Sequence, residues 1–394
     1  MPPKNTRLTS LDGLRGVAAF VVLMHHSLLT IPSLAGAYYP GRPIRGLGEL
    51  LLTYSPVHIV WAGTEAVYLF FILSGFVLAL PSARGPRDWN RYFPSRLVRL
   101  YVPVWAAVVF GLVTTLLVHR TGHQPSAWIN DHNPSYGLHS LLSDGTLLGG
   151  ISGVLTQLWS LQWEIVFSIL LPLYLFISPR IRARSMILGC LVLILVGSLG
   201  TNQSLIHLPM FGIGVAFAKG WPSLLRFAER VNAKSWQWAF WGAVAIVSVV
   251  LTTAYWLPGP STTHFYNASR VVIVLGAMGF MLLGALSPAA RFLLTLPPIR
   301  VLGTMSFSLY LVHEPIVVSL AYLLPHSPGL AIPLGVVLSL GIGWAFYRVV
   351  EKPVSALSRR IARSGDMVRV DDPEQITGGN PPREATDGTP HAQT

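Results

Sequence analysis

Several ionisable side chains lie inside long apolar stretches of the chain, where a charge is expensive. They are Arg15, His26, Glu65, Glu164, His313 and Glu314. On insertion scales a charged residue at mid-membrane costs about 2.5–3.5 kcal/mol, and such residues usually pair inside a bundle and mark function. Histidine titrates near neutral pH, so it can take a proton from a weak nucleophile such as a hydroxyl. The pattern therefore predicts a functional site within the membrane.

Spacing selects some of these residues as neighbours. Arg15 and His26 are eleven residues apart, which places them within ~20° of one helix face and ~16 Å apart along it. His25 points about 80° away from Arg15 and is expected to be a packing histidine. Counted along their helices, His26, Glu164 and His313 lie about 22, 21 and 18 Å from the same membrane face. A cluster of two histidines and one carboxylate is therefore predicted.

Basic residues near that face are suited to a different task. Arg96 and Arg99 are three residues apart and share a helix face. Guanidinium groups match phosphate well, so these two residues and Arg15 are candidate phosphate ligands, although any loop on this side is expected to be basic. Pro315 is expected to break its helix and to free the carbonyl of Leu311. Gly75 is expected to allow a close helix approach.

Composition shows what must position these groups. Of the 394 residues, 52% are hydrophobic and 11% charged, and the mean hydropathy is +0.54. Soluble domains carry about 25% charged residues, so the sequence predicts an all-α polytopic membrane protein. We expect about ten transmembrane helices, near 11–31, 60–80, 100–119, 158–177, 185–200, 203–219, 237–257, 269–286, 301–324 and 330–350. The fifth and sixth are expected to form a tight hairpin around residues 201–204.

Charge distribution predicts the orientation. With both termini in the cytosol, only Arg42, Arg45, Arg120 and Arg270 of the 28 basic residues fall outside, as the positive-inside rule requires. The net charge of +12 is thus explained by topology, and no nucleic-acid partner is expected. The first helix is interpreted as a retained span and not a signal peptide. Residues 1–353 are predicted to form the membrane domain, and 354–394 a cytosolic tail, basic at first and then disordered.

The outer loops and the cysteine content limit the chemistry further. The long outer loops are expected near 32–57 and 120–157, and the second contains His123, Asp131, His132, His139 and Asp144. These residues lack metal-ligand spacing, so no metal site is predicted. Cys190 is the only cysteine, which excludes a disulfide within the chain. The absence of a usable cysteine and of a GxSxG motif argues against a covalent intermediate on serine or cysteine, and leaves a covalent intermediate on histidine open.

Short motifs along the chain resemble those of the acyltransferase-3 family of membrane O-acyltransferases. They are Leu11-Asp12-Gly13-Leu14-Arg15-Gly16 followed by His26, Phe70-Phe71-Ile72-Leu73-Ser74-Gly75-Phe76, Arg96-Leu97-Val98-Arg99, Trp159-Ser160-Leu161-Gln162-Trp163-Glu164, the stretch from Ser306 to Pro315, and Glu351-Lys352-Pro353. They occur in the order of the family and cover residues 8–353. The chain departs from the family pattern at Tyr68, Ile165 and Ser168, so the resemblance leaves the acceptor open.

The resemblance implies acyl-CoA, often acetyl-CoA, as a donor substrate and no bound cofactor. The acceptor would be a hydroxyl on a carbohydrate or a glycosylated small molecule, and the enzyme would lie in the plasma or inner membrane. Together with the residue types, this suggests that Arg15, Arg96 and Arg99 bind donor phosphates and that His26 is the general base. Glu164 would orient His26, and His313 would relay a proton or position the acceptor. Supporting roles are expected for Asp12, Ser74, Ser160, Tyr310 and Glu314.

Two other classes of protein fit the same buried charges. A proton-coupled secondary transporter uses intramembrane His and Glu and broken helices. The repeated pair of interrupted spans typical of inverted repeats is not visible in the sequence. In a receptor or assembly protein, loss of the buried charges would damage folding and not turnover. Consumption of acyl-CoA separates the acyltransferase from both.

Overall fold

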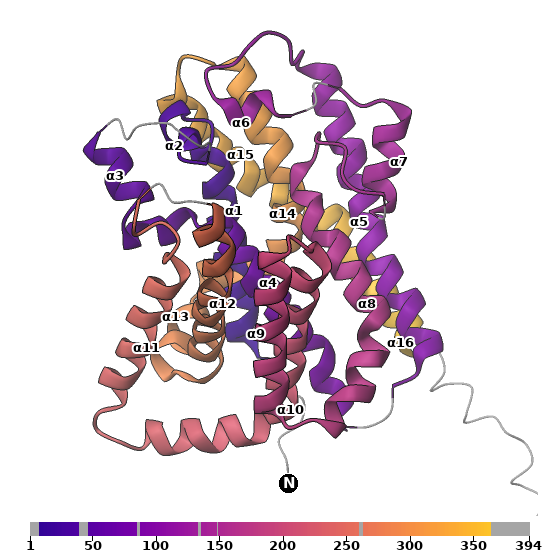
Figure 1. The fold of residues 1–394 in the computed structure, drawn as a ribbon. Helices are drawn as coiled ribbons and strands as arrows, with labels where there is room; N and C mark the ends of the chain where they lie inside the picture. The colour runs from indigo at the N-terminus through magenta and orange to yellow at the C-terminus, as the bar shows by residue number, and fades with distance from the viewer. Residues whose placement is uncertain are drawn as a thin grey trace, which may run out of the picture.

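The computed structural model describes residues 8–38, 46–84, 87–132, 135–147, 149–259 and 263–363. Lys4, Arg7, Arg42, Arg45 and the predicted disordered part of the tail, residues 364–394, lie outside these ranges. All regular structure in the described ranges is helical (Figure 1). The predicted all-α fold class is confirmed.

Each of the ten predicted spans coincides with a helix. These are α1 (Thr9–Leu28), α4 (Gly63–Ala79), α5 (Trp89–Leu117), α8 (Trp159–Ile177), α9 (Ala183–Leu199), α10 (Gln203–Asn232), α11 (Gln237–Thr252), α12 (Thr263–Leu286), α14 (Pro297–Leu323) and α15 (Pro328–Phe346). Within the described residues, six helical segments are long and apolar enough to cross a membrane, while α9 and α11 are apolar but shorter. The chain is therefore a multi-pass membrane protein, and the count of ten and the orientation stay predictions.

Short helices fill the two predicted outer loops. The first holds α2 (Pro32–Gly36), α3 (Leu47–Thr53) and the 3₁₀ helix η1 (Pro56–Trp61), and the second holds α6 (Ala127–Asn130), α7 (Leu138–Thr146) and η3 (Thr156–Leu158). Helices α2, α3, α6 and α7 all lie in the upper part of the molecule, with α3 on the left and α7 on the right (Figure 1). Asp144 fixes part of the second loop because its carboxylate accepts from Ser152 N at 2.6 Å and from the Tyr136 hydroxyl at 2.9 Å. Both loops are thus structured caps on one end of the bundle.

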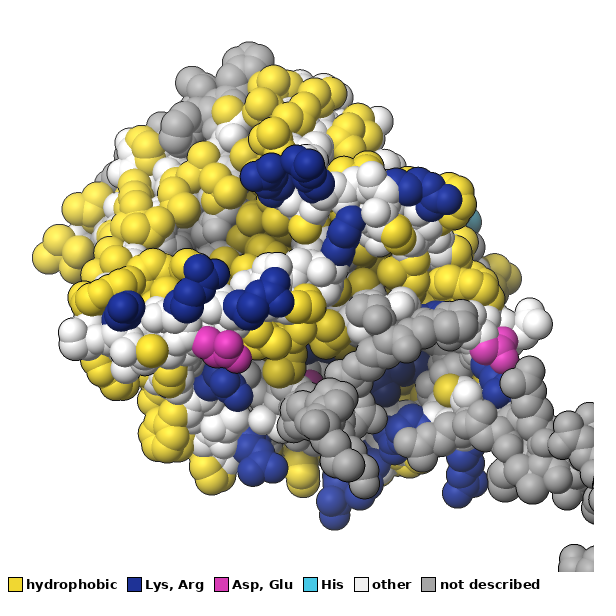
Figure 2. All heavy atoms as spheres, turned by 90° about the horizontal axis from the view of Figure 1, so that it is seen from below, with side chains coloured by type: hydrophobic (Ala, Val, Ile, Leu, Met, Phe, Trp, Pro, Cys, Tyr) yellow, Lys and Arg dark blue, Asp and Glu magenta, His cyan; other side chains and the backbone are white. Residues whose placement is uncertain are grey.

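The other described elements lie between or after the spans. They are η2 (Leu80–Arg84), η4 (Ser178–Arg180), α13 (Pro288–Leu294), the π-helical turn η5 (Tyr347–Glu351) and α16 (Lys352–Arg363). Helix α16 packs along α5, so the start of the predicted tail is an ordered helix. Seen from below, the molecule shows many Lys and Arg side chains and few acidic ones (Figure 2). This basic face matches the side predicted to be cytosolic.

Close glycine contacts join the central helices. A Cβ on Gly16 would lie 2.3 Å from Gly303 N, and one on Gly303 would lie 2.4 Å from the carbonyl oxygen of Asp12. Helices α1 and α14 therefore touch backbone to backbone, which brings their polar side chains within reach of each other. Likewise, a Cβ on Gly75 would lie 2.0 Å from the carbonyl oxygen of Phe211 on α10. The close approach predicted at Gly75 is confirmed.

The predicted hairpin between the fifth and sixth spans is also present. Thr201 adopts a left-handed conformation with φ of 54°. The next residue, Asn202, caps α10 because its side chain accepts from Leu205 N at 3.1 Å, while its own N–H donates to Gly197 O at 2.8 Å. The turn between α9 and α10 is therefore closed by local hydrogen bonds, as its short polar sequence suggests.

Candidate active site

A cavity of about 880 Å³ lies between α1, α4, α5, α8, α14 and α16. Among the described residues that line it, seven are basic and three are acidic. The basic residues are Arg15, Arg87, Arg96, Arg99, Arg300, Lys352 and Arg359, and the acidic ones are Asp12, Glu164 and Glu351. Because basic groups outnumber carboxylates, the cavity is suited to an anionic ligand. The predicted phosphate ligands Arg15, Arg96 and Arg99 therefore meet in one cavity.

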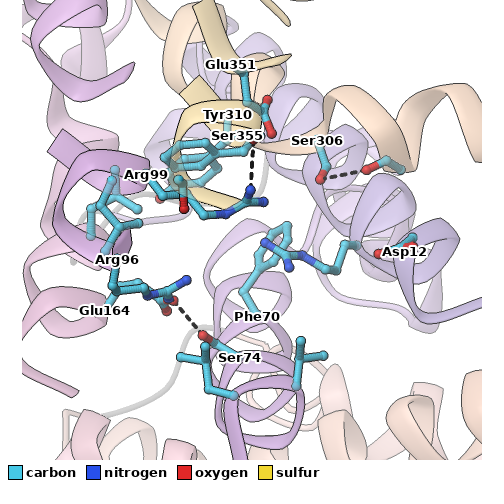
Figure 3. A pocket seen from close by; sticks show the side chains of 18 of the residues that line it. Asp12, Phe70, Ser74, Arg96, Arg99, Glu164, Ser306, Tyr310, Glu351 and Ser355 are labelled. Atoms are coloured by element: carbon cyan, nitrogen blue, oxygen red, sulfur yellow. Dashed lines mark hydrogen bonds and ion pairs between the residues drawn. The ribbon is translucent and has the colours of Figure 1, made fainter. Parts of the chain in front are cut away.

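Glu164 and Arg96 form an ion pair on one wall of this cavity (Figure 3). Their side chains are 15% and 14% exposed. The same carboxylate oxygen accepts from Ser74 Oγ at 2.5 Å, and Arg96 Nε donates to Ser168 Oγ at 3.1 Å. Three helices, α4, α5 and α8, thus fix the Arg96 guanidinium at the cavity wall. Ser168, where the chain departs from the family pattern, is part of this arrangement.

Helix α16 closes a second wall. Arg99 Nη1 donates to Ser355 Oγ at 2.8 Å (Figure 3), and the hydroxyls of Ser95 and Ser358 lie 2.9 Å apart. Glu351 accepts from Ser308 Oγ at 2.6 Å, which ties the preceding turn to α14. Sequence reasoning missed the cavity residues Lys352, Ser355, Ser358 and Arg359. The alternation of serine and basic residues in an amphipathic helix was the available signal.

Tyr310 and Ser160 line the deep end of the cavity. Their hydroxyl oxygens lie 2.6 Å apart, and the Tyr310 hydroxyl donates to Gln157 O at 2.7 Å. The ring centroid of Tyr310 lies 6.1 Å from the ring centroid of Phe70 and 5.9 Å from that of His313. The deep end of the cavity is therefore one side chain away from the predicted histidine pair.

His26 and His313 lie beyond this end and face each other. His26 Nδ1 is 2.8 Å from His313 Nε2, and the two rings stack with centroids 5.0 Å apart. His313 Nδ1 lies 3.0 Å from the carbonyl oxygen of Leu309. A carbonyl only accepts, so Nδ1 of His313 carries the proton and its Nε2 accepts from His26 Nδ1–H. In these neutral tautomers His26 Nε2 keeps its lone pair.

Glu314 supplies the carboxylate next to this pair. Its Oε2 lies 3.4 Å from His26 Nδ1 and accepts from Gln157 N at 3.0 Å. Its Oε1 accepts from Thr156 N at 2.6 Å. Glu314 is fully buried, so these contacts replace the water that the carboxylate loses.

The structure thus divides the predicted site residues into two groups. His26, His313 and Glu314 form one group, whereas Glu164 lies in the basic cavity with Arg96 and is not in contact with the histidines in any described interaction. Asp12, Ser74, Ser160 and Tyr310 line the cavity. The predicted cluster of two histidines and a carboxylate exists, with Glu314 in the place expected for Glu164. The equal predicted depth of Glu164 and the two histidines did not identify the carboxylate partner, because depth does not determine the direction in which a side chain points from its helix.

Three other expectations have clear outcomes. His25 is a packing residue as predicted, and its Nδ1 lies 2.9 Å from the carbonyl oxygen of Trp61. The predicted break at Pro315 is wrong, because α14 continues to Leu323. The freed carbonyl of Leu311 is confirmed, and it accepts from the side-chain amide of Gln157 at 2.9 Å. Glu65 lies apart from both groups and accepts from Trp256 Nε1 at 3.2 Å.

The chain is similar to known acyltransferases along most of its length. A family model described as an acyltransferase domain matches residues 8–348. The acyltransferase MdmB of Streptomyces mycarofaciens is 30% identical over 185 residues, which are 47% of this chain and 43% of that protein. The peptidoglycan O-acetyltransferase OatA of Listeria monocytogenes is 23% identical over 320 residues, 73% of this chain and 49% of that protein.

A third relative is matched over more of its length. The O-acetyltransferase PaAT-1 of Phomopsis amygdali is 24% identical over 374 residues, 80% of this chain and 73% of that protein. The chain spans less than half the length of the first two relatives. No solved structure matches it. Since the family model covers residues 8–348, the chain belongs to the acyltransferase-3 family.

Proposed function

We propose that this chain transfers an acyl group, acetyl in the first place, from acyl-CoA to a hydroxyl of a carbohydrate or of a glycosylated small molecule. One observation carries the proposal. The basic cavity reaches Tyr310, whose ring lies 5.9 Å from that of His313. The basic residues that would hold a phosphate-bearing donor and the histidine pair that would transfer a proton therefore both lie close to Tyr310.

The basic end of the cavity is suited to the phosphate groups of the donor. Arg15, Arg96 and Arg99 line it, and Glu164 and Ser168 hold the guanidinium group of Arg96 in a fixed orientation. A guanidinium held in this way loses less side-chain entropy when it binds a phosphate. Glu164 accordingly acts through Arg96, and not on His26. Lys352 and Arg359 add positive charge from α16.

The histidine pair is suited to the proton transfer. The acceptor hydroxyl gives its proton to His26 Nε2 while its oxygen forms a bond to the carbonyl carbon of the thioester. The carbon–sulfur bond then breaks, and the proton returns to the departing thiolate. Glu314, 3.4 Å from His26 Nδ1, stabilises the imidazolium that forms in between. His313 fixes the tautomer of His26 through the 2.8 Å contact.

The names of the relatives support the choice of acceptor. OatA is named as a peptidoglycan O-acetyltransferase, and a Bacillus subtilis relative, 23% identical over 364 residues, is named as a putative one. These names favour a carbohydrate hydroxyl as the acceptor, and the plasma or inner membrane is proposed as the location.

The test is a purified-protein assay in nanodiscs with acetyl-CoA labelled on the acetyl group. We expect thioester consumption that depends on an added hydroxyl acceptor, such as a mixture of cell-wall oligosaccharides. A protein that neither binds nor consumes acetyl-CoA, but takes up a solute into vesicles under a proton gradient, would contradict the proposal and favour a transporter.

A further inference from the structure

Part of the second outer loop reaches into the bundle beside the histidine pair. The ring of Trp128, on α6, stacks on the ring of His26 with centroids 5.3 Å apart and planes 20° apart. Ile129 packs against Val318 of α14. Ser126 Oγ donates to the carbonyl oxygen of Leu29 at 2.6 Å. The loop is therefore anchored next to both helices that carry the pair.

His132 is the residue of this loop that contacts the site directly. Its Nε2 lies 3.1 Å from Glu314 Oε1, and the two side chains are 1% and 0% exposed. Its Nδ1 lies 2.9 Å from the carbonyl oxygen of Trp128. Both ring nitrogens thus face oxygen atoms, and the carbonyl oxygen can only accept.

This geometry defines how the buried charge is balanced. Glu314 accepts from two backbone N–H groups, which suit an ionised carboxylate. Next to such a carboxylate, His132 donates from Nε2 to Glu314 Oε1, while its Nδ1 faces the carbonyl oxygen of Trp128. A buried carboxylate needs a partner of this kind, because an uncompensated charge in the interior is strongly destabilising.

We propose that His132 is a positioning residue that holds the Glu314 carboxylate against His26, so that the outer loop completes the site. The inference rests on the proposed acyl transfer for its effect on turnover. Oε1 of Glu314 is held by the loop, which leaves Oε2 directed at His26 Nδ1 at 3.4 Å. Without His132 the carboxylate loses a buried side-chain hydrogen-bond partner, and the support of His26 weakens.

Turnover of two His132 variants tests this role. His132→Leu removes the donor, whereas His132→Gln keeps an N–H group that can reach Glu314. We expect His132→Leu to lower kcat about 10- to 100-fold, the usual cost of losing a supporting hydrogen bond at a site. The donor KM should stay unchanged, because His132 is not among the residues that line the basic cavity. His132→Gln should recover most of the loss.

The matched control is His139→Gln, the same change at an exposed histidine of the same loop, which should behave as wild type. Wild-type kcat in His132→Leu would overturn the positioning role, as would an effect on the donor KM alone. An equal loss in His132→Gln and His132→Leu would also overturn it, since the retained donor would then have no effect.

A second measurement does not depend on activity. Thermal unfolding of wild type, His132→Leu, Glu314→Gln and the double variant forms a double-mutant cycle. Contact between the two groups predicts that the double variant loses less thermal stability than the sum of the single variants. Additive losses would overturn the inference. If the wild type consumes no thioester while the cycle shows coupling, the proposed function fails and the contact stands.

Discussion

At the scale of single residues, the two carboxylates nearest the site serve different cations. Glu164 pairs with Arg96 in the basic cavity, whereas Glu314 lies among the histidines. In the proposed function, the first arrangement fixes a phosphate ligand and the second supports proton transfer. The two carboxylates should therefore affect different kinetic constants.

Glu164→Gln removes the charge that holds Arg96. We expect the donor KM to rise about tenfold, equivalent to about 1.4 kcal/mol, with little change in kcat. The measurement is steady-state acetyl-CoA consumption by the variant in nanodiscs, with Glu229→Gln, an exposed acidic position on α10, as the matched control. A fall in kcat at constant KM would instead place Glu164 next to the proton transfer.

Much of the histidine site was predictable at this scale. His26 and His313 stand out because few polar residues occur in these spans, and helix geometry gives their depth. The carboxylate partner was misassigned because the rotation of α8 about its axis depends on packing, which the sequence does not specify. Glu314 follows His313 directly, and this adjacency was the signal for the correct partner. His132 was not predictable, since its loop has no periodic pattern.

At the scale of elements, the crossing of α1 and α14 sets the distance between His26 and His313. Gly303→Ala would place a Cβ 2.4 Å from the carbonyl oxygen of Asp12 and would push the helices apart. A displacement of about 1 Å at a site costs on the order of 100-fold in rate, so kcat should fall by about that factor. The control is Gly341→Ala on α15, where a Cβ meets nothing within 4 Å. Unchanged kcat in folded Gly303→Ala would contradict this account of the crossing.

Helix α16 forms part of the cavity although it follows the segment matched by the family model. Arg359→Ala removes a positive side chain from the cavity lining. We expect the donor KM to rise about threefold to tenfold without a change in kcat, because a partly solvated charge contributes modestly. Arg360→Ala is the matched control, because Arg360 is the next residue, is exposed and does not line the cavity. Equal effects of both variants would mean that α16 acts only through its overall charge.

Helix positions were predictable because a membrane crossing needs about 20 apolar residues. The ends of the helices were less predictable than their positions. Helix α5 begins at Trp89 and includes Arg96 and Arg99, which the sequence placed before the span. Helix α10 continues to Asn232, well past the predicted end. Polar and basic residues are compatible with both helix and loop, so hydropathy alone does not mark where a helix leaves the membrane.

At the scale of the whole molecule, the basic face in Figure 2 is predicted to lie in the cytosol. Ser235 and Ser327 are exposed, the first between α10 and α11 and the second between α14 and α15. Single cysteines at these positions in a Cys190→Ala background report the orientation. We expect a membrane-impermeant maleimide to label Ser327→Cys and not Ser235→Cys in intact cells. The reverse labelling would invert the orientation and place the donor cavity outside.

The most direct test of the whole account is to measure acetyl-CoA binding and turnover by wild type and His26→Ala at equal, monodisperse yield. General base catalysis contributes about 10²- to 10⁴-fold, so kcat should fall by this factor while donor binding stays at the wild-type level. Bound but unconverted acetyl-CoA would confirm that the cavity and the histidine pair have separate tasks. Near-complete transfer by His26→Ala would contradict the account.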